Sequence, residues 1–354
     1  MSEAKLDVSR SPGERRPPAL RSATGAFGAW TRSGDIRPLA AWVLALAFLF
    51  TYAAVQPGTL SNAQLGIICA DTLPLAALAL GQGIVILTAG IDLSVGGVLS
   101  LSTTIAATHF TNDGAMVVWS LVILAFGIAA GAINGLLIGR FGLQPFIVTL
   151  ATWSIYDGIA LYVLPVEGGQ VPLGFANWIN NSASGLPNAI WALIVMVVIW
   201  LWFKRTRTAR QIYAIGSDRE GARIAGVSID RTLVVTYAIS GFCAAAAALF
   251  YVMLTASGDP TSGDSLILPS VAAVVIGGTN LFGGKGGFVG TVAGALTLTL
   301  LGNVIFVFNL PSYWTVVADG LLLILAVLMG GGLQQLQLRR MRRRQCPRRT
   351  RRRP

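Results

Sequence analysis

Apolar runs recur along almost the whole chain, and short polar segments separate them. An α-helix needs about 20 mostly apolar residues to cross a hydrocarbon core of about 30 Å, whereas the strands of outer-membrane barrels alternate between apolar and polar positions. Ten apolar runs cover roughly residues 39–55, 65–89, 95–110, 115–139, 145–164, 188–203, 232–256, 266–282, 286–308 and 312–332. This pattern predicts an all-α polytopic membrane protein with about ten transmembrane helices. The third, sixth and eighth runs are short, which predicts tilted, broken or re-entrant segments there.

The positions of the basic residues predict how these helices are oriented. Of 26 Lys and Arg residues, seven lie in residues 1–37, ten lie in Arg339–Pro354 and seven follow the sixth run; Arg140 and Lys285 follow the fourth and eighth runs. Basic residues collect on the cytoplasmic side of membrane proteins. With the N-terminus inside, ten spans place all of them on that side. We therefore expect a multi-pass membrane protein with both termini cytoplasmic.

Composition excludes a soluble enzyme. Hydrophobic residues make up 54% of the chain, charged residues only 12%, and the mean hydropathy is +0.68, whereas soluble domains carry about 25% charged residues. The net charge of +11 falls to +1 without the ten Arg residues of the tail, so it does not indicate nucleic-acid binding.

The same patterns divide the chain into three parts. These are a flexible cytoplasmic N-terminal segment (1–37), a transmembrane domain (38–332) and an Arg-rich cytoplasmic tail (333–354). Membrane lipid is the expected partner of the tail, because clusters of basic residues beside a span attract anionic headgroups.

Two stripes of glycine at four-residue spacing predict close helix packing. Residues four apart share one face of a helix, and small residues there let a neighbouring helix approach. The stripes are Gly127, Gly131, Gly135 and Gly139 in the fourth run, and Gly286, Gly290 and Gly294 in the ninth.

Polar residues inside the apolar runs are candidates for a solute pathway or its hinge. Two Gly-rich turns, residues 89–97 and 277–287, join apolar segments with almost no loop between them. Irregular backbone at membrane depth occurs only where it is buried in protein or lines a cavity. Asp92 in the first turn is either a helix cap or a transport residue, because membrane carboxylates face the bundle interior or water. The candidates are Gln82, Asp92, Ser94 and Asn134.

The basic loop 204–231 contains a predicted helix over residues 218–225. The sequence SDRE from Ser217 to Glu220 fits a capping box, in which Ser217 and Glu220 satisfy backbone N–H groups reciprocally. Gly226 is expected to end the helix in a left-handed conformation. Arg223 lies on the same short helix. From the loop alone, docking to a partner protein and contact with anionic lipid are equally supported.

No pattern indicates catalysis, a metal or a cofactor bound by this chain. The three cysteines have no metal-like spacing, and no phosphate-binding loop of the type G-x-x-x-x-G-K-[ST] occurs. If ATP powers the protein, another chain must hydrolyse it. A transporter driven by an ion gradient is the rival interpretation, with proton or sodium chemistry on membrane carboxylates. These carboxylates would be Asp71, Asp92, Asp157 and Asp319.

Four sequence blocks resemble the permease subunits of sugar ABC importers of the ribose/xylose/arabinose type. The blocks are GQGIVILTAGIDLSVG at 81–96, QPFIVTLAT at 144–152, YAIG at 213–216 with ARIAGV at 222–227, and VIGGT at 275–279 with GGKG at 283–286. Ala89 stands where the family usually has Gly, and GSD at 216–218 stands where it more often has GGN. Permeases for branched-chain amino acids share the last block, but the IDLSVG stretch favours a sugar.

The resemblance implies a permease that translocates a monosaccharide, such as a ribose-like pentose, as one half of a homodimer. It also implies a separate cytoplasmic ABC ATPase and an external sugar-binding protein as partners. The loop 204–231 would then be the ATPase-coupling loop, shaped by Ser217, Glu220, Arg223 and Gly226.

Overall fold

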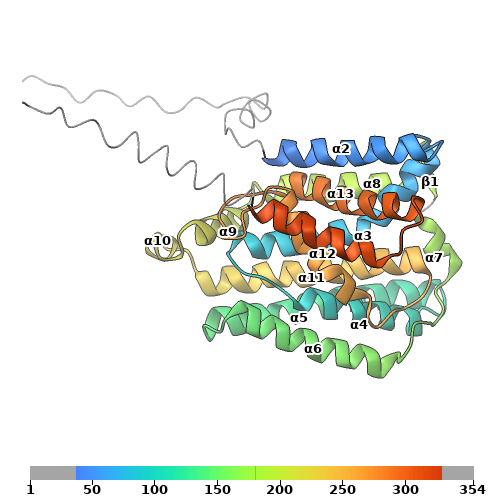
Figure 1. The fold of residues 1–354 in the computed structure, drawn as a ribbon. Coiled ribbons are helices and arrows are strands. Elements are labelled where there is room, and N and C mark those ends of the chain that lie inside the picture. Colours follow the sequence, from blue (N-terminus) through green and yellow to red (C-terminus); the bar gives the residue numbers. More distant parts are fainter. Residues whose placement is uncertain (1–36, 180, 329–354) are drawn as a thin grey trace, which may run out of the picture. The chain divides into compact units, whose positions relative to one another are not determined.

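The computed structural model describes residues 37–179 and 181–328, and most of them lie in helices (Figure 1). The residues before Arg37 and the Arg-rich tail, both predicted to be cytoplasmic, lie outside the described residues. Each of the ten apolar runs corresponds to a helix. These helices are α2 (Arg37–Val55), α3 (Asn62–Leu87), α4 (Ser94–His109), α5 (Asp113–Arg140), α6 (Pro145–Val163), α8 (Asn188–Phe203), α11 (Ile229–Thr255), α12 (Ser262–Ile276), α13 (Phe288–Val307) and a last helix, Tyr313–Leu328.

The predicted all-α polytopic membrane fold is confirmed, while the number of ten spans is not. Within residues 37–179 and 181–328, six helices are long and apolar enough to cross a membrane: α2, α3, α5, α6, α11 and α13. The helix α8 and the following helix α9 (Arg207–Ser217) pass the same test together but are bent by 76°. The third, sixth and eighth runs form helices of 16, 16 and 15 residues, as their short apolar runs predicted.

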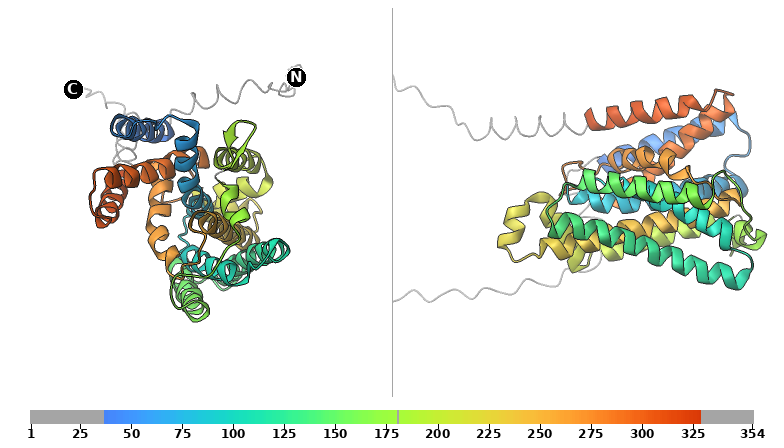
Figure 2. Two further views of the ribbon diagram at one scale, coloured as in Figure 1. Left: turned by 90° about the vertical axis from the view of Figure 1, so that its right-hand side faces the viewer. Right: turned by 90° about the horizontal axis from the view of Figure 1, so that it is seen from below.

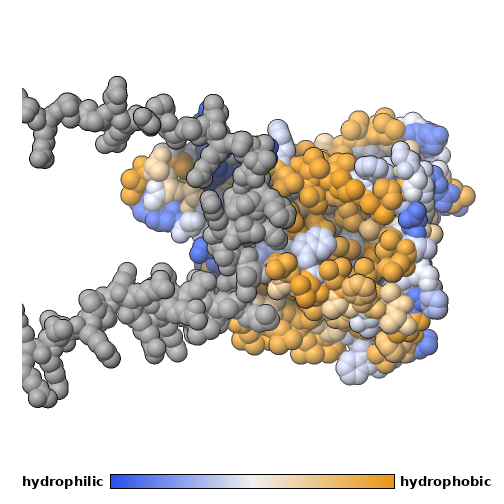
Figure 3. Space-filling model, turned by 90° about the horizontal axis from the view of Figure 1, so that it is seen from above, coloured by the Kyte–Doolittle hydropathy of each residue, from blue (hydrophilic) through white to orange (hydrophobic). Residues whose placement is uncertain are grey.

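Helix burial separates an inner from an outer set of helices. The apolar windows of α3, α11 and α13 are mostly buried, and those of α2, α5 and α6 are mostly exposed. Seen end-on in the left panel of Figure 2, α2 and α6 lie at opposite edges of the bundle. Figure 3 shows one face of the molecule, on which hydrophobic residues cover the surface between more hydrophilic ends. Such an exterior suits contact with lipid.

Glycine brings α5 against α11 at the predicted stripe. A Cβ atom at Gly127 would meet the carbonyl oxygen of Gly241, and one at Gly131 would meet that of Tyr237. One turn further on, a Cβ at Gly135 would lie 2.5 Å from the Cα of Val234. Gly139 packs in the same way against Asp230. The two backbones therefore touch along the second half of α5, since these positions have no side chain to hold them apart.

The second glycine stripe was only partly predicted correctly. Gly290 and Gly294 of α13 pack against the carbonyl oxygens of Gly277 and Ala273, which brings α13 against α12. Gly286 was expected on the same helical face, and that prediction is wrong. It lies in the turn before α13 with φ of +145°, a conformation that other residues rarely adopt.

The segment between α6 and α8 contains two elements that the hydrophobic pattern did not indicate. A short helix, α7 (Leu173–Trp178), precedes a hairpin of β1 (Ser182–Ala183) and β2 (Leu186–Pro187). Ser184 and Gly185 connect the strands with positive φ at both residues, which suits a two-residue hairpin turn. In Figure 1, these elements lie at the end of the bundle opposite α9 and the short helix α10 (Arg219–Ile224).

Candidate functional site

A break in the helical backbone separates α3 from α4. Helix α3 ends at Leu87 and α4 begins at Ser94, so six residues between them follow a non-helical path. Within this path, Ala89 adopts φ of +63°. A non-glycine residue is strained in this left-handed region because its Cβ approaches the following carbonyl group. Ala89 stands where the ribose-type family usually has Gly, and the backbone conformation at this position is one that favours Gly.

Asp92 is the centre of a buried hydrogen-bond network in this break. Its Oδ1 accepts hydrogen bonds from the backbone N–H of Ser94 at 3.0 Å and from the Ser94 hydroxyl at 2.6 Å. Its Oδ2 accepts from the Ser240 hydroxyl of α11 at 2.8 Å. The Asn134 amide of α5 donates to the Ser94 hydroxyl at 2.8 Å. The first turn of α4 is therefore fixed to both α11 and α5.

The network explains the choice of polar residues at these positions. Each of the four side chains is at most 2% exposed, so they hydrogen-bond one another in place of bulk water. Of these side chains, only the amide oxygen of Asn134 has no partner among the described residues. Asp92 satisfies one free N–H at the start of α4, but Leu93 holds the N-cap position and makes no side-chain cap bond, so Asp92 is not the helix cap itself. Being closed off from the surface, the network positions the break and does not form an open solute site in this conformation.

Three of the four predicted pathway residues meet in this network, and the fourth does not. Gln82 is fully buried in α3, but neither its amide oxygen nor its amide nitrogen has a hydrogen-bond partner among the described residues. Ser240 completes the network and was missed by sequence reasoning. Its only signal is a hydroxyl group within the long apolar run of α11, and that signal is too common to single it out.

Three backbone segments that are distant in sequence meet at the end of α3, directly before the break. The backbone N–H of Gly284, in the turn between α12 and α13, donates to the carbonyl oxygen of Leu87 at 3.0 Å. Gly216, near the end of α9, packs on both groups, so that a Cβ there would meet the carbonyl oxygen of Leu87 and the nitrogen of Gly284. We call this contact of Leu87, Gly216 and Gly284 the glycine junction. It attaches the second Gly-rich turn, 277–287, to the end of α3, two residues before the first Gly-rich turn begins.

Side-chain hydrogen bonds support the junction from α9. The Tyr213 hydroxyl donates to the carbonyl oxygen of Gly286 at 2.7 Å, and the Ser217 hydroxyl donates to the carbonyl oxygen of Tyr213 at 2.8 Å. Burial raises the pKa of Tyr213 to about 12, so its hydroxyl keeps its proton and remains a donor at neutral pH. The end of α9 is thus attached to the turn that precedes α13.

Helix α9 itself was not predicted. Thr206 caps it by accepting a hydrogen bond from the N–H of Ala209, while Ile212 and Ile215 are buried and Arg207 and Arg210 are exposed. A capping Thr followed by apolar residues at three-residue spacing is a signal that could have found this helix.

The predicted capping box of α10 is wrong, although the helix itself occurs where expected. Asp218, not Ser217, caps the helix, and its Oδ1 accepts from the N–H of Gly221 at 3.0 Å. Glu220 does not reach back to the cap. Both of its oxygens accept hydrogen bonds from Arg223, at 2.6 and 3.0 Å, and this pair lowers the pKa of Glu220 below its usual range.

The predicted end of α10 is confirmed. Gly226 has φ of +82°, its N–H bonds the carbonyl oxygen of Arg223, and the N–H of Val227 bonds that of Ala222. These two bonds form a Schellman motif, which ends the helix sharply. The tip of α10 therefore exposes Arg223 beside the apolar side chain of Ile224, which is 79% exposed.

No group of three or more His, Cys, Asp or Glu side chains suited to a metal ion occurs in residues 37–179 and 181–328. The arrangement instead consists of the break between α3 and α4 within an apolar bundle. Backbone contacts join the end of α3 to α9, which leads into the exposed helix α10. Such a fold and site define a polytopic membrane protein in which α9 contacts the end of α3, directly before the break between α3 and α4.

Sequence comparisons identify the kind of membrane protein. The chain belongs to the family described as branched-chain amino acid transport system / permease component, whose profile matches residues 64–327. Its resemblance to the ribose-type permeases is confirmed. It is 36% identical over 261 residues to the ribose import permease protein RbsC of Haemophilus influenzae, covering 72% of this chain and 80% of the relative.

Two further relatives extend the comparison. The autoinducer 2 import system permease protein LsrC of an Enterobacter species is 33% identical over 310 residues, covering 86% of this chain and 90% of the relative. The D-allose transport system permease protein AlsC of Escherichia coli is 34% identical over 257 residues, covering 71% and 78%. No solved structure matches the chain significantly.

Proposed function

We propose that the chain is the membrane-spanning permease of an ATP-driven importer for a monosaccharide, either a ribose-like pentose or a related sugar. The observation that carries this proposal is its similarity to permeases named for ribose, autoinducer 2 and D-allose. The family match includes both the α3–α4 break and the α9–α10 segment. This similarity favours a sugar over branched-chain amino acids and an ATP-driven importer over an ion-gradient transporter.

ATP is bound and hydrolysed by a separate cytoplasmic ABC ATPase in this proposal, and α10 is the element that docks on it. An exposed, capped helix that carries an Arg–Glu pair next to an exposed Ile offers a partner both charge and apolar surface. The ATPase shifts the permease between its inward-open and outward-open states only if it binds the two states differently.

The glycine junction gives a physical route from the docking helix to the membrane. A displacement of α9 moves Gly216 against the carbonyl oxygen of Leu87, and backbone atoms in contact leave no side chain to absorb the shift. Leu87 ends α3 directly before the break. Motion of the coupling segment would therefore change the angle between α3 and α4.

The remaining partners follow from the same proposal. A sugar-binding protein outside the membrane delivers the solute, and a second copy of the chain completes the pathway. The protein lies in the bacterial inner membrane with α9, α10 and both termini in the cytoplasm, where seven basic residues between Lys204 and Arg231 favour that side. The Arg-rich tail binds anionic lipid.

The test is assembly and ATP hydrolysis in a reconstituted complex. The full chain is placed in liposomes with a candidate ATPase subunit, with and without a sugar-loaded binding protein. Stable assembly and faster hydrolysis with the loaded binding protein are expected. Failure to assemble with several ATPases, together with uptake that an ionophore abolishes, would replace this proposal with the ion-gradient transporter.

A further inference from the structure

Helix α6 differs from the other exposed helices by a carboxylate well inside its length. Helices α2, α5 and α6 are the least buried of the six long apolar helices. The exposed side chains at the middle of α2 and α5 are large and apolar, for example Phe50 and Leu121. Helix α6 also exposes large apolar side chains, such as Ile155, but it carries in addition Trp153 and Asp157, which are half-buried and lie four residues apart on one helical face. Placing a carboxylate against lipid costs free energy, so this side of α6 is not expected to face lipid.

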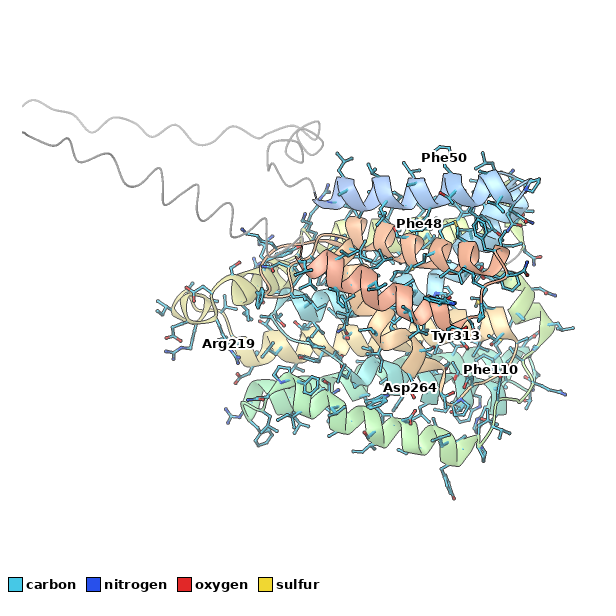
Figure 4. All side chains as sticks on the ribbon, viewed as in Figure 1. Phe48, Phe50, Phe110, Arg219, Asp264 and Tyr313 are labelled. Carbon is cyan, nitrogen blue, oxygen red and sulfur yellow. The ribbon has the colours of Figure 1, made fainter. Side chains whose placement is uncertain are left out.

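Asp264, from the first turn of α12, joins these residues. The indole N–H of Trp153 donates to its Oδ1 at 2.9 Å. Figure 4 shows Asp264 between α12 and α6. Asp157 presents a second carboxylate, of which Oδ1 is buried without a hydrogen-bond partner among the described residues. We call Trp153, Asp157 and Asp264 the polar face.

Asp157 lies well inside α6, away from both ends of the helix. Asp157 is 12 residues after the start of α6 and six residues before its end, which places it about 18 Å and about 9 Å from the two ends of the helix. A hydrocarbon core is about 30 Å thick, and carboxylates within it face a bundle interior or water. The carboxylate of Asp157 is therefore expected to be covered by protein, water or a polar solute.

The polar face is also connected to the break. Gly97 of α4 packs on α6, where a Cβ would lie 2.7 Å from the carbonyl oxygen of Trp153. The adjacent Gly96 packs on α12, where a Cβ would lie 3.2 Å from the carbonyl oxygen of Gly263. Both glycines are in the first turn of α4, directly after Asp92 and its network. A change of angle at the break would move α6 and α12 with α4.

We propose that the polar face lines a water-filled pathway and binds the sugar as it crosses the membrane. Carboxylate oxygens accept hydrogen bonds from sugar hydroxyl groups, and an indole ring packs on the apolar C–H face of a sugar ring. A second copy of the chain closes the pathway opposite α6 and α12. This inference rests on the proposed function, because it takes a monosaccharide as the solute.

Cysteine accessibility tests the pathway without relying on transport. Cys69, Cys243 and Cys346 are first replaced by Ala, and Asp157→Cys, Asp264→Cys or Leu121→Cys is then introduced into the full complex. Leu121 is the matched control, since it is 64% exposed and about 12 Å from the end of α5. A charged, water-soluble thiol reagent should modify Asp157→Cys and Asp264→Cys at least tenfold faster than Leu121→Cys. Equal rates at all three positions would overturn the proposal.

The sugar is tested with the same variants. Saturating sugar, delivered by the binding protein, should slow modification of Asp157→Cys severalfold, and Asp157→Asn should lower sugar uptake at least tenfold. Asp71→Asn makes the same chemical change on α3, away from the polar face, and should keep uptake within twofold. Fast modification that no sugar slows would overturn the sugar site. In a complex without sugar-stimulated ATP hydrolysis, the same result would overturn the proposed function as well.

Discussion

The backbone N–H of Gly284 donates a hydrogen bond to the carbonyl oxygen of Leu87 over 3.0 Å, and this bond links the turn before α13 to the end of α3. Gly216 packs on the same two groups. The end of α9, the end of α3 and a Gly-rich turn thus come into direct backbone contact. When one of these segments moves, the others must move with it. Side chains between them could absorb the movement by changing rotamer, but backbone atoms cannot.

Substitution of Gly216 should uncouple ATP hydrolysis from uptake. A Cβ at this position overlaps the carbonyl oxygen of Leu87, so Gly216→Ala must push α9 away from the junction. Overpacking of this kind costs about 1–3 kcal/mol. We expect at least a tenfold loss of uptake per ATP hydrolysed in the reconstituted complex.

Gly320→Ala is the control for that experiment, because no atom lies within 4 Å of the added methyl group. It should leave the ratio of uptake to hydrolysis unchanged. Full coupling in Gly216→Ala would contradict a mechanical role of the junction.

Loss of the Asp92 carboxylate should destabilise the protein more than loss of Ser240. Asp92→Ala leaves the Ser94 N–H and two hydroxyl groups buried without their acceptor, and each such group costs about 1–3 kcal/mol. Ser240→Ala removes one hydrogen bond, which contributes about 1 kcal/mol. Thermal melting of the purified protein in detergent measures both. Ser312→Ala, at an exposed position, serves as the control; a melting temperature of Asp92→Ala equal to it would refute the network.

Ala89→Gly should stabilise the break. The left-handed conformation of Ala89 costs about 1–2 kcal/mol, and Gly removes this cost, although part of the gain is lost to the greater freedom of Gly in the unfolded chain. The melting temperature should rise by a few degrees. In contrast, Ala79→Gly within α3 should lower it, since Gly in a helix interior costs about 1 kcal/mol relative to Ala. A lower melting temperature for both variants would show that position 89 does not need positive φ.

Charge reversal on α10 should prevent docking of the ATPase. Glu220→Lys and Arg223→Glu each break the pair and invert one surface charge. We expect each single variant to lose co-purification with the ATPase at least tenfold. The double variant restores an ion pair in the opposite orientation and should also fail to dock, because the surface charges stay inverted. Recovery of binding in the double variant would show that the pair only stabilises α10.

The main outlines of this protein follow from its sequence. The ten apolar runs correspond to ten helices because burial of backbone polar groups in lipid requires helical hydrogen bonds, whatever the neighbours are. The short third, sixth and eighth runs, the stripe from Gly127 to Gly139 and the end of α10 at Gly226 were predicted for similar reasons. Each depends on spacing or backbone conformation within one segment.

Other features depend on contacts between distant segments. The hydrophobic pattern gives no indication that Ser240 bonds Asp92, which lies 148 positions earlier. The capping box was mistaken because Asp218 and Ser217 are both good caps, and Ser217 bonds the carbonyl oxygen of Tyr213 within the preceding helix, α9. Gly286 was assigned to the wrong element because periodicity cannot show where a turn ends and a helix begins.

The sequence by itself determined the all-α membrane fold, the family and the residue types of the break, since these depend on hydrophobicity, periodicity and local backbone preference. Only the tertiary structure decided which polar groups meet: the network around Asp92, the glycine junction and the polar face of Trp153, Asp157 and Asp264. The physical reason is that hydrogen bonds and backbone contacts act over a few ångströms. Which residues come that close depends on how the helices pack.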